Sequence, residues 1–488
     1  MTTRPDSGPT SLSARRSRAR LARAVTAAFV CAALSAAGCG ASSASSDATH
    51  HLKHSNRNPD PAAQYAQCMR THGVPNFPNP VDGHIQLSPA SGIDPSSPQF
   101  KAASQACASL GPSGGTPAGT APGDRATTTT TPVSEAQWTA FSEWLKQQAA
   151  QGQFSGTVLV ARDGKQLLDA GYGIADRETE VPNTPHTKFC IASIGKLFTA
   201  VAVAQLVEQH KLAFNDTIGH YLKGFAPAIA DQVTVGELLT MTSGLGNVAL
   251  GRPSPPSTLA AMMHLIVKEP LQFKPGSQFL YSNDGYIALG AIIQSVTGQS
   301  YAAYVREHVF QPAGMTQTGV SVYTPARVAG MAHGYMLVGA NGQPLGTSAP
   351  PAPGQSTTPQ PSSLRDNSAM QQIANPSGGA YSTVGDLLKF AQALLDHKLL
   401  SPAMTDTVLV PRVNAPQPGG PPVDKYTYGF AYQAINGISF IGHNGGTPGY
   451  EGQIDIYPKT SYVVAMLTNQ DQVLIPAIQK SEAILTSG

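Results

Sequence analysis

Ser193-Ile194-Gly195-Lys196 stands at the head of an apolar run that ends near Gln209, and it is the only S-x-x-K pattern in the 488-residue chain. Residues three apart on a helix are neighbours, at roughly 5 to 6 Å between Cβ atoms, so the lysine amine can reach the serine hydroxyl and, if desolvated, accept its proton. Unpaired N–H groups at a helix N-terminus also favour developing negative charge. The pattern therefore predicts a nucleophilic serine. A capping serine followed by an exposed lysine is the alternative, because a lone S-x-x-K arises by chance about once or twice in a chain of this length.

Two other short motifs accompany the S-x-x-K. Tyr281-Ser282-Asn283 is the only Y-x-N in the chain, and we expect it to open a second helix after Pro275-Gly276. His443-Asn444-Gly445 is the only H-x-G, and we expect it at the end of a strand. Together the three motifs favour an enzyme.

In order and spacing, the three motifs resemble those of the penicillin-recognising serine hydrolases. This family includes class C β-lactamases, D-alanyl-D-alanine carboxypeptidases of the same fold, and related esterases and D-aminopeptidases. The phrases at 233–245, 273–276 and 375–383 support the resemblance, which covers essentially residues 140–488. It implies a β-lactamase/transpeptidase-like fold and an acyl-enzyme on a serine, without a cofactor or a metal.

The resemblance assigns a role to each motif residue. It makes Ser193 the nucleophile, Lys196 its proton acceptor and Tyr281 a second base that also protonates the leaving group. Asn283 is expected to orient Lys196 and the substrate amide. A tyrosine, with a pKa near 10, is a useful base only if an adjacent cation such as Lys196 favours its phenolate.

The third motif differs from the β-lactamases proper, which carry K-T-G where this chain has His443-Asn444-Gly445. Antibiotic hydrolysis is therefore not implied. A histidine at this place is found in the family's carboxypeptidases and D-aminopeptidases, and we expect His443 to bind a substrate carboxylate as a partly charged donor, with affinity falling as pH rises past about 6.5. A structural histidine in a Gly-rich turn is the alternative. The resemblance places the oxyanion hole at the N–H groups of Ser193 and Gly446, and Gly445 and Gly446 would let the strand approach the acyl group.

The pattern of apolar residues after 134 predicts an α+β fold. Asp163-Gly164 and Asn436-Gly437 each separate two strand-like runs, which is a strong signal for a two-residue hairpin. Hairpins at opposite ends of the domain suggest one antiparallel sheet, which strands at 453–457 and 462–467 would join. The expected architecture is an antiparallel sheet flanked by helices plus an all-helical subdomain. The ranges predicted to be helices are 193–210, 234–241, 282–297 and 383–395, and the Pro-rich segments 341–375 and 411–424 are predicted to be loops.

The N-terminal region carries targeting signals. Residues 1–38 have six Arg against Asp6, followed by a run of small apolar residues, as in a signal peptide, and the run ends at Cys39 in a sequence resembling a lipobox. Lipidation at Cys39 would place the protein on the extracytoplasmic face of the membrane. Ordinary cleavage, and secretion, is the alternative. No later stretch approaches about 18 apolar residues, so the lipid would be the only membrane contact.

The rest of the N-terminal half is predicted to alternate between extended and compact segments. Residues 39–61 are a polar tether, 62–110 a small module stapled by a disulfide between Cys68 and Cys107, 111–133 a Gly/Pro/Thr linker, and 134–488 the hydrolase domain. Two free thiols are the alternative to the disulfide. Cys190 is expected to be a buried packing thiol.

Composition limits the partners. Outside residues 1–38 the chain carries a net charge of −3, so a basic surface for nucleic acid is not indicated. His50, His51 and His54 lie in the tether, where three unsupported imidazoles more often hold nothing than a metal.

Three functions fit these observations. The first is a D-alanyl-D-alanine carboxypeptidase-type hydrolase acting on a small peptide, with peptidoglycan as the natural source. The second is an esterase or D-aminopeptidase of the same family, since one acyl-transfer apparatus serves either bond. The third is an inactive lipoprotein that binds peptidoglycan or a partner through the 62–110 module.

Overall fold

The computed structural model describes residues 61–78, 99–100, 103, 106–107, 133–252, 254–345, 362–416 and 423–487. The chain divides into two units, Met1–Arg125 and Ala126–Gly488. The predicted signal peptide, Cys39, the three tether histidines and the linker as far as residue 132 lie outside the described residues. Within the described part, no helix is both long and apolar enough to cross a bilayer.

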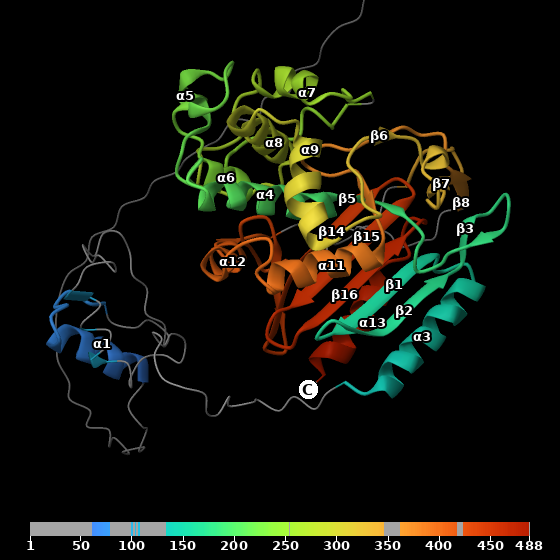
Figure 1. Ribbon diagram of the computed structural model, residues 1–488, viewed down its shortest axis with the longest axis horizontal. Helices are drawn as coiled ribbons and strands as arrows, with labels where there is room; N and C mark the ends of the chain where they lie inside the picture. The colour runs from blue at the N-terminus through green and yellow to red at the C-terminus, as the bar shows by residue number, and fades with distance from the viewer. Residues whose placement is uncertain are drawn as a thin grey trace, which may run out of the picture. The chain divides into compact units, whose positions relative to one another are not determined.

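An antiparallel sheet of eight strands forms the centre of the second unit (Figure 1). Both predicted hairpins belong to it, which confirms the single-sheet interpretation. In each turn both central residues have positive φ, at 48° and 77° for Asp163-Gly164 and at 52° and 79° for Asn436-Gly437, the conformation that suits Asn or Asp followed by Gly. In spatial order the strands are β11 (Val413–Asn414), β12 (Lys425–Tyr426), β13 (Ala431–Ile435), β14 (Ile438–Thr447), β15 (Tyr450–Tyr457), β16 (Tyr462–Thr468), β1 (Gly156–Arg162) and β2 (Lys165–Tyr172).

Each face of the sheet is covered by its own apolar layer, because alternate residues of a strand point to opposite faces. On one face, Val158 and Val160 of β1 pack with α3 (Glu135–Ala150) and α13 (Ile475–Thr486). On the other face, Leu159 and Ala161 belong to the larger core. The helices of that core include α4 (Lys196–Glu208), α8 (Asn283–Thr297) and α11 (Val384–Leu395).

A helical subdomain is inserted between β5 (Phe189–Ala192) and β6 (Val322–Tyr323), as predicted. Its apolar α4 is buried on all sides, which fits a helix at the centre of a core. Besides α4 and α8, its helices are α5 (Pro227–Ala230), α6 (Val235–Leu239), α7 (Leu259–Ile266), α9 (Tyr301–Val305) and α10 (Gln311–Ala313), with a π-helical turn at Arg306–Phe310. Outside this subdomain, α12 (Pro402–Leu409) lies between α11 and the strand β11.

The prediction of loops at 341–375 and 411–424 was partly wrong. The first segment contains β8 (Ser362–Asp366), paired with β7 (Tyr335–Gly339), and β9 (Gln372–Ile373), paired with β6. The second contains the edge strand β11. Such short edge strands carry too few alternating residues to be recognised in a Pro-rich sequence.

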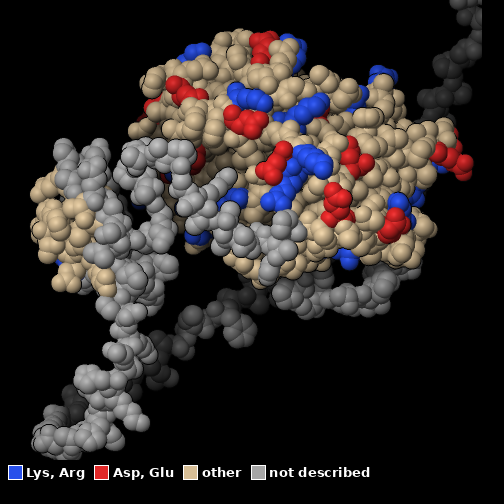
Figure 2. All heavy atoms as spheres, turned by 60° about the horizontal axis from the view of Figure 1, so that its bottom comes forward, with Lys and Arg blue, Asp and Glu red and all other residues tan. Residues whose placement is uncertain are grey.

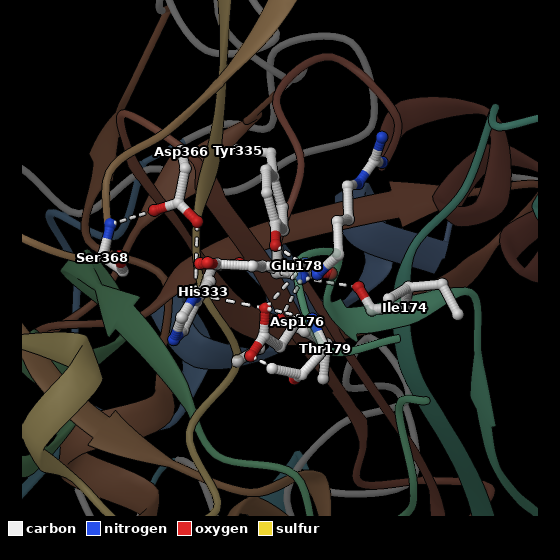
Figure 3. Close-up of polar contacts among 12 residues, drawn as sticks. Ile174, Asp176, Glu178, Thr179, His333, Tyr335, Asp366 and Ser368 are labelled. Atoms are coloured by element: carbon white, nitrogen blue, oxygen red, sulfur yellow. Dashed lines mark hydrogen bonds and ion pairs between the residues drawn. The ribbon is translucent and has the colours of Figure 1, made fainter. Parts of the chain in front are cut away.

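Polar contacts around His333 join three segments that are far apart in the chain (Figure 3). Its Nδ1 lies 3.2 Å from an Asp366 oxygen at the end of β8 and 3.6 Å from an Asp176 oxygen at the end of β3 (Ile174–Asp176). The other Asp366 oxygen accepts a hydrogen bond from the Ser368 N–H at 2.5 Å. These contacts fix the start of the segment 367–373, whose later residues form one wall of the cavity described below.

The described part of the first unit is a small module around α1 (Pro61–Thr71). A disulfide joins Cys68 to Cys107, which confirms the predicted staple. Its small core, which includes Ala66, Met69 and Phe77, contains too little apolar surface for a stable domain without such a covalent link.

Surface charge is mixed on the second unit. On the face in Figure 2, Lys and Arg side chains alternate with Asp and Glu, and no patch of one sign dominates.

The remaining short strands are β4 (Val181–Pro182), paired with β3, and β10 (Ala380–Ser382), paired with β5.

Candidate active site

Ser193 lies where β5 turns into a helix. The strand ends at Ala192, a 3₁₀ turn covers Ser193–Gly195, and α4 begins at Lys196. Ala192 has φ 42° and ψ −126°, a conformation that non-glycine residues rarely adopt and that costs of order 1 to 3 kcal/mol. The sharp reversal places the Ser193 side chain on a cavity wall instead of in the core beneath it.

Lys196 is completely buried, and its partners carry no charge. Its Nζ lies 2.7 Å from Asn283 Oδ1, 2.6 Å from the Ser377 carbonyl oxygen and 3.2 Å from Ser193 Oγ. Burial lowers the pKa of Lys196 well below its usual value. A neutral amine has two N–H groups and one lone pair. The two carbonyl oxygens accept the N–H groups, and the lone pair remains to receive the Ser193 proton.

Asn283 is the first residue of α8, and Tyr281 lies two residues before it. The Ser282 hydroxyl caps the helix by accepting the Gly285 N–H at 2.9 Å, so the predicted helix start is confirmed. Lys196 Nζ lies 4.7 Å from the centre of the Tyr281 ring. The structure thus brings the four predicted side chains together around one point.

Tyr281 retains its proton more tightly than the sequence analysis assumed. Burial raises its pKa, and a hydrogen bond with Ser193 opposes this only in part. Burial also disfavours the positive charge of Lys196, so Lys196 supports a phenolate less than its proximity alone suggests. Tyr281 is therefore a neutral phenol beside the nucleophile.

Two positioning residues escaped the sequence analysis. The Asn247 side chain donates to the Tyr281 carbonyl at 2.9 Å and accepts the Asn283 N–H at 2.7 Å, so it fixes both ends of the Y-x-N motif. Ser377 holds Lys196 through its backbone carbonyl, which no side-chain motif can reveal. The only signal was the Gly378-Gly379 pair that follows, whose φ angles of 153° and 79° belong to the region that favours glycine.

His443 lies inside the long strand β14 and not at a strand end, and it is 2% exposed. Its Nδ1 donates to the Asn444 carbonyl at 2.5 Å, so its Nε2 accepts from the Tyr426 hydroxyl at 3.0 Å. Burial lowers the pKa of His443 to about 3. Desolvation opposes a charge on this imidazole, and both of its nitrogens are hydrogen-bonded within the protein. A role for His443 in binding a substrate carboxylate stays a prediction.

Gly445 allows β14 to approach Ser193 closely. A Cβ on Gly445 would stand 2.2 Å from the Ile191 carbonyl oxygen and 3.1 Å from the Ser193 nitrogen, so only glycine fits. Gly446 and Ser193 line the same cavity, as the predicted oxyanion hole requires.

The cavity in front of Ser193 has a volume of about 260 Å³. Asn283, Gly446, Thr447 and the segment 370–373 form its walls, and none of the described lining residues carries a charge. Cys190 also reaches the wall, but burial raises the pKa of its thiol, which agrees with the packing role expected for it. The site presents hydrogen-bonding groups and apolar surface to a substrate.

Comparisons with known proteins agree with this geometry. Penicillin-binding protein 4* of Bacillus subtilis is 28% identical over 335 residues, covering 66% of this chain and 69% of its own. The crystal structure of a penicillin binding protein from Bacillus halodurans superposes with a TM-score of 0.58 at 30% identity, covering 70% of this chain and 98% of that one. D-amino acid amidase from Ochrobactrum anthropi shares the fold at 23% identity, with a TM-score of 0.60 and coverage of 72% and 97%.

The sequence profile of the family described as Beta-lactamase matches residues 141–484. This range contains all three motifs and every side chain placed around Ser193. The chain belongs to the Beta-lactamase family of serine hydrolases.

Proposed function

We propose that the protein hydrolyses an uncharged ester or amide through an acyl-enzyme on Ser193. The observation that carries the proposal is Lys196, a fully buried amine whose hydrogen-bonding partners are all neutral oxygens. Such an amine is a base at neutral pH, and one of its contacts is the nucleophile itself.

The acylation step follows from these contacts. Ser193 Oγ attacks the substrate carbonyl and its proton passes to Lys196. The developing oxyanion is held by the N–H groups of Ser193 and Gly446. Tyr281 then gives its phenolic proton to the leaving oxygen or nitrogen, and the Lys196 ammonium restores the proton to Tyr281. Water hydrolyses the acyl-enzyme by the reverse path.

The neutral walls of the cavity support an uncharged substrate. A carboxylate beside the scissile bond would lose its hydration without gaining a cationic partner among the described lining residues. The neutral His443 offers it no charge either. We therefore place the esterase or amidase alternative first. The D-amino acid amidase that shares the fold acts on a related bond, as its name states.

A D-alanyl-D-alanine carboxypeptidase is the second candidate. It is favoured by the names of the relatives, two of which are penicillin-binding proteins, and by Thr447, whose position on the cavity wall beside Gly446 suits a neutral donor to a carboxylate. Peptidoglycan would then be the partner.

We also propose that the mature protein is attached to the outer face of the cell membrane by a lipid on Cys39, with the hydrolase domain outside the cell. The support is the order of the Arg-rich start, the apolar run and the cysteine. Mass analysis of the membrane fraction, with Cys39→Ser as the control, tests this: loss of a lipid-sized mass in the variant is expected, and equal masses would overturn it.

The test of activity uses a matched pair of substrates, N-acetyl-D-alanyl-D-alanine and its C-terminal amide, which differ by one charge. A p-nitrophenyl ester serves as a third, uncharged substrate. Higher kcat/KM for the ester and the neutral amide is expected. Preference for the free carboxylate would overturn the first candidate in favour of the second.

Intact mass after exposure to a fluorophosphonate and to penicillin tests the nucleophile. We expect fluorophosphonate to add one adduct to the wild type and none to Ser193→Ala. Penicillin labelling would favour the carboxypeptidase. Labelling by neither reagent would leave the inactive binding lipoprotein as the function and overturn the proposal.

A further inference from the structure

We propose that Cys68, Cys107 and His72 of the small module form a Zn²⁺ site when the disulfide is reduced. These three residues are a group whose potential ligand atoms all lie within 4.8 Å of one another, and no other such group exists among the described residues. The proposal concerns the first unit and is independent of the function of Ser193.

The distances match a tetrahedral zinc centre. His72 Nδ1 lies 3.5 Å from Cys68 Sγ and 3.7 Å from Cys107 Sγ. With zinc–sulfur bonds of about 2.3 Å and zinc–nitrogen bonds of about 2.0 Å, a sulfur and a nitrogen at the tetrahedral angle stand about 3.5 Å apart. Two of the three edges are therefore already in place. The third forms when the two sulfurs separate to about 3.8 Å.

The chain positions these ligands without large rearrangement. His72 directly follows α1, which ends at Thr71, and its N–H donates to the Cys68 carbonyl at 3.0 Å as in a helix. Residues four apart in such a turn share one face. Cys107 is buried and held beside them by the core that contains Ala66 and Met69. Reduction removes the bond between the sulfurs, and a Zn²⁺ ion bound to both of them would replace the link that this small core needs. His72 is exposed, so solvent can reach the site and supply a fourth ligand.

Helix capping is the competing explanation for His72. Its Nδ1–H donates at 2.9 Å to the Cys68 carbonyl, which also accepts the His72 N–H at 3.0 Å and the Thr71 hydroxyl at 2.8 Å near the end of α1. Capping accounts for that contact, but it does not require the same nitrogen to stand at similar distances from both sulfurs. A metal would take the place of the Nδ1 proton, and that proton would move to Nε2.

A dithiol can reduce the Cys68–Cys107 disulfide. Two electrons from the dithiol break the Cys68–Cys107 bond and give two thiols, while the dithiol becomes a disulfide. Binding of Zn²⁺ then releases the two thiol protons and the Nδ1 tautomeric proton moves to Nε2. Oxidation in the presence of a chelator restores the disulfide. The module would thus exchange its disulfide for a zinc cross-link between the same two sulfurs.

The test uses the full chain, oxidised and after reduction by a dithiol, titrated with Co²⁺ and then with Zn²⁺. We expect reduction to produce thiolate-to-cobalt charge-transfer absorption, which one equivalent of Zn²⁺ removes. His72→Ala should weaken Zn²⁺ binding by more than about tenfold, the loss that even an outer-shell partner produces. His54→Ala, which removes a histidine of the tether, and Cys190→Ser, which removes a thiol of the other unit, are matched controls and should bind as the wild type does.

Three outcomes would overturn the proposal. These are the absence of reduction-dependent absorption, equal binding by His72→Ala and the wild type, and loss of binding in either control. Because His72 is exposed, its substitution leaves the small core intact, so the test does not depend on a destabilised variant. Cys107→Ser adds a second arm, and retained cobalt absorption in that variant would also contradict the site.

Discussion

Two lysines of the same domain, Lys389 and Lys196, lie in opposite electrostatic environments. Lys389 on α11 is about half exposed and donates to the buried carboxylate of Asp386 at 2.9 Å. Lys196 on α4 is completely buried, and only neutral oxygens surround its Nζ. A carboxylate keeps a lysine charged and makes it part of the structure, whereas burial without one removes the proton and makes the lysine a base. The missing counter-charge is therefore a functional feature.

Removing the Lys196 amine should produce the largest effect. We expect Lys196→Met, like Ser193→Ala, to lower kcat/KM for an ester by about 10³-fold or more, because nucleophile and base act as a unit. Lys389→Met is the matched control and should keep wild-type activity. Comparable rates in Lys196→Met and Lys389→Met would end the distinction between the two lysines.

Giving Lys196 a carboxylate partner should make it resemble Lys389. Asn283→Asp would place a carboxylate where an oxygen now stands 2.7 Å from Nζ, and it should raise the pKa of Lys196. A base is active above its pKa, so the acid limb of the pH–kcat/KM profile should move to higher pH. The rate below that limb falls about tenfold for each pKa unit. Asn283→Ala, which adds no charge, should be slower without this shift.

Removing the counter-charge of Lys389 should affect stability and not catalysis. Asp386 also accepts the Gln317 N–H at 2.6 Å and the Thr318 hydroxyl at 2.9 Å. Asp386→Asn weakens these charge-assisted bonds, and we expect the free energy of unfolding in urea to fall by roughly 1 to 3 kcal/mol. A loss of kcat/KM at unchanged stability would contradict this assignment.

Asp455 on β15 of the sheet is a buried acid, and burial disfavours its charge just as it disfavours the charge of Lys196. Burial raises the pKa of Asp455 to about 8, and nearby Glu482, whose own pKa burial raises to about 7, adds to the effect. Between about pH 4 and pH 8 the folded state holds a proton that the unfolded state has lost. The free energy of unfolding should therefore fall as pH rises through this window, by up to about 1.4 kcal/mol per pH unit. Denaturation of Asp455→Asn should show a shallower slope, and an equal slope would reject the role of Asp455.

His443 should show the smallest effect. With a pKa of about 3 it stays neutral across the working range, so KM for an anionic substrate should be constant between pH 5.5 and pH 8. A rise of KM past pH 6.5 would instead restore the partly charged donor.

The parts of the fold that were predictable are those with local causes. The Asp163-Gly164 and Asn436-Gly437 turns need positive φ at both positions. Asp or Asn followed by Gly adopts these angles most readily, so the two turns can be recognised from the sequence. The spacing of Ser193 and Lys196 likewise has a local geometric meaning. The disulfide followed from the small size of its module.

The parts that were not predictable depend on distant packing. Whether His443 is charged depends on its burial against Tyr426 and Lys196, which the motif does not encode. The hold of Ser377 on Lys196 is a backbone contact, and backbone atoms are the same in every residue type. The short strands β8 and β9 form only because partners elsewhere in the chain pair with them.

The unfavourable backbone of Ala192 has a practical consequence for engineering. Selection for heat resistance favours substitutions that relieve backbone strain, so it acts against the strained Ala192 conformation that exposes the Ser193 hydroxyl. Libraries screened for survival alone should therefore gather variants that outlast the parent and turn over less. Pairing the heat challenge with a turnover screen would keep that conformation in the population.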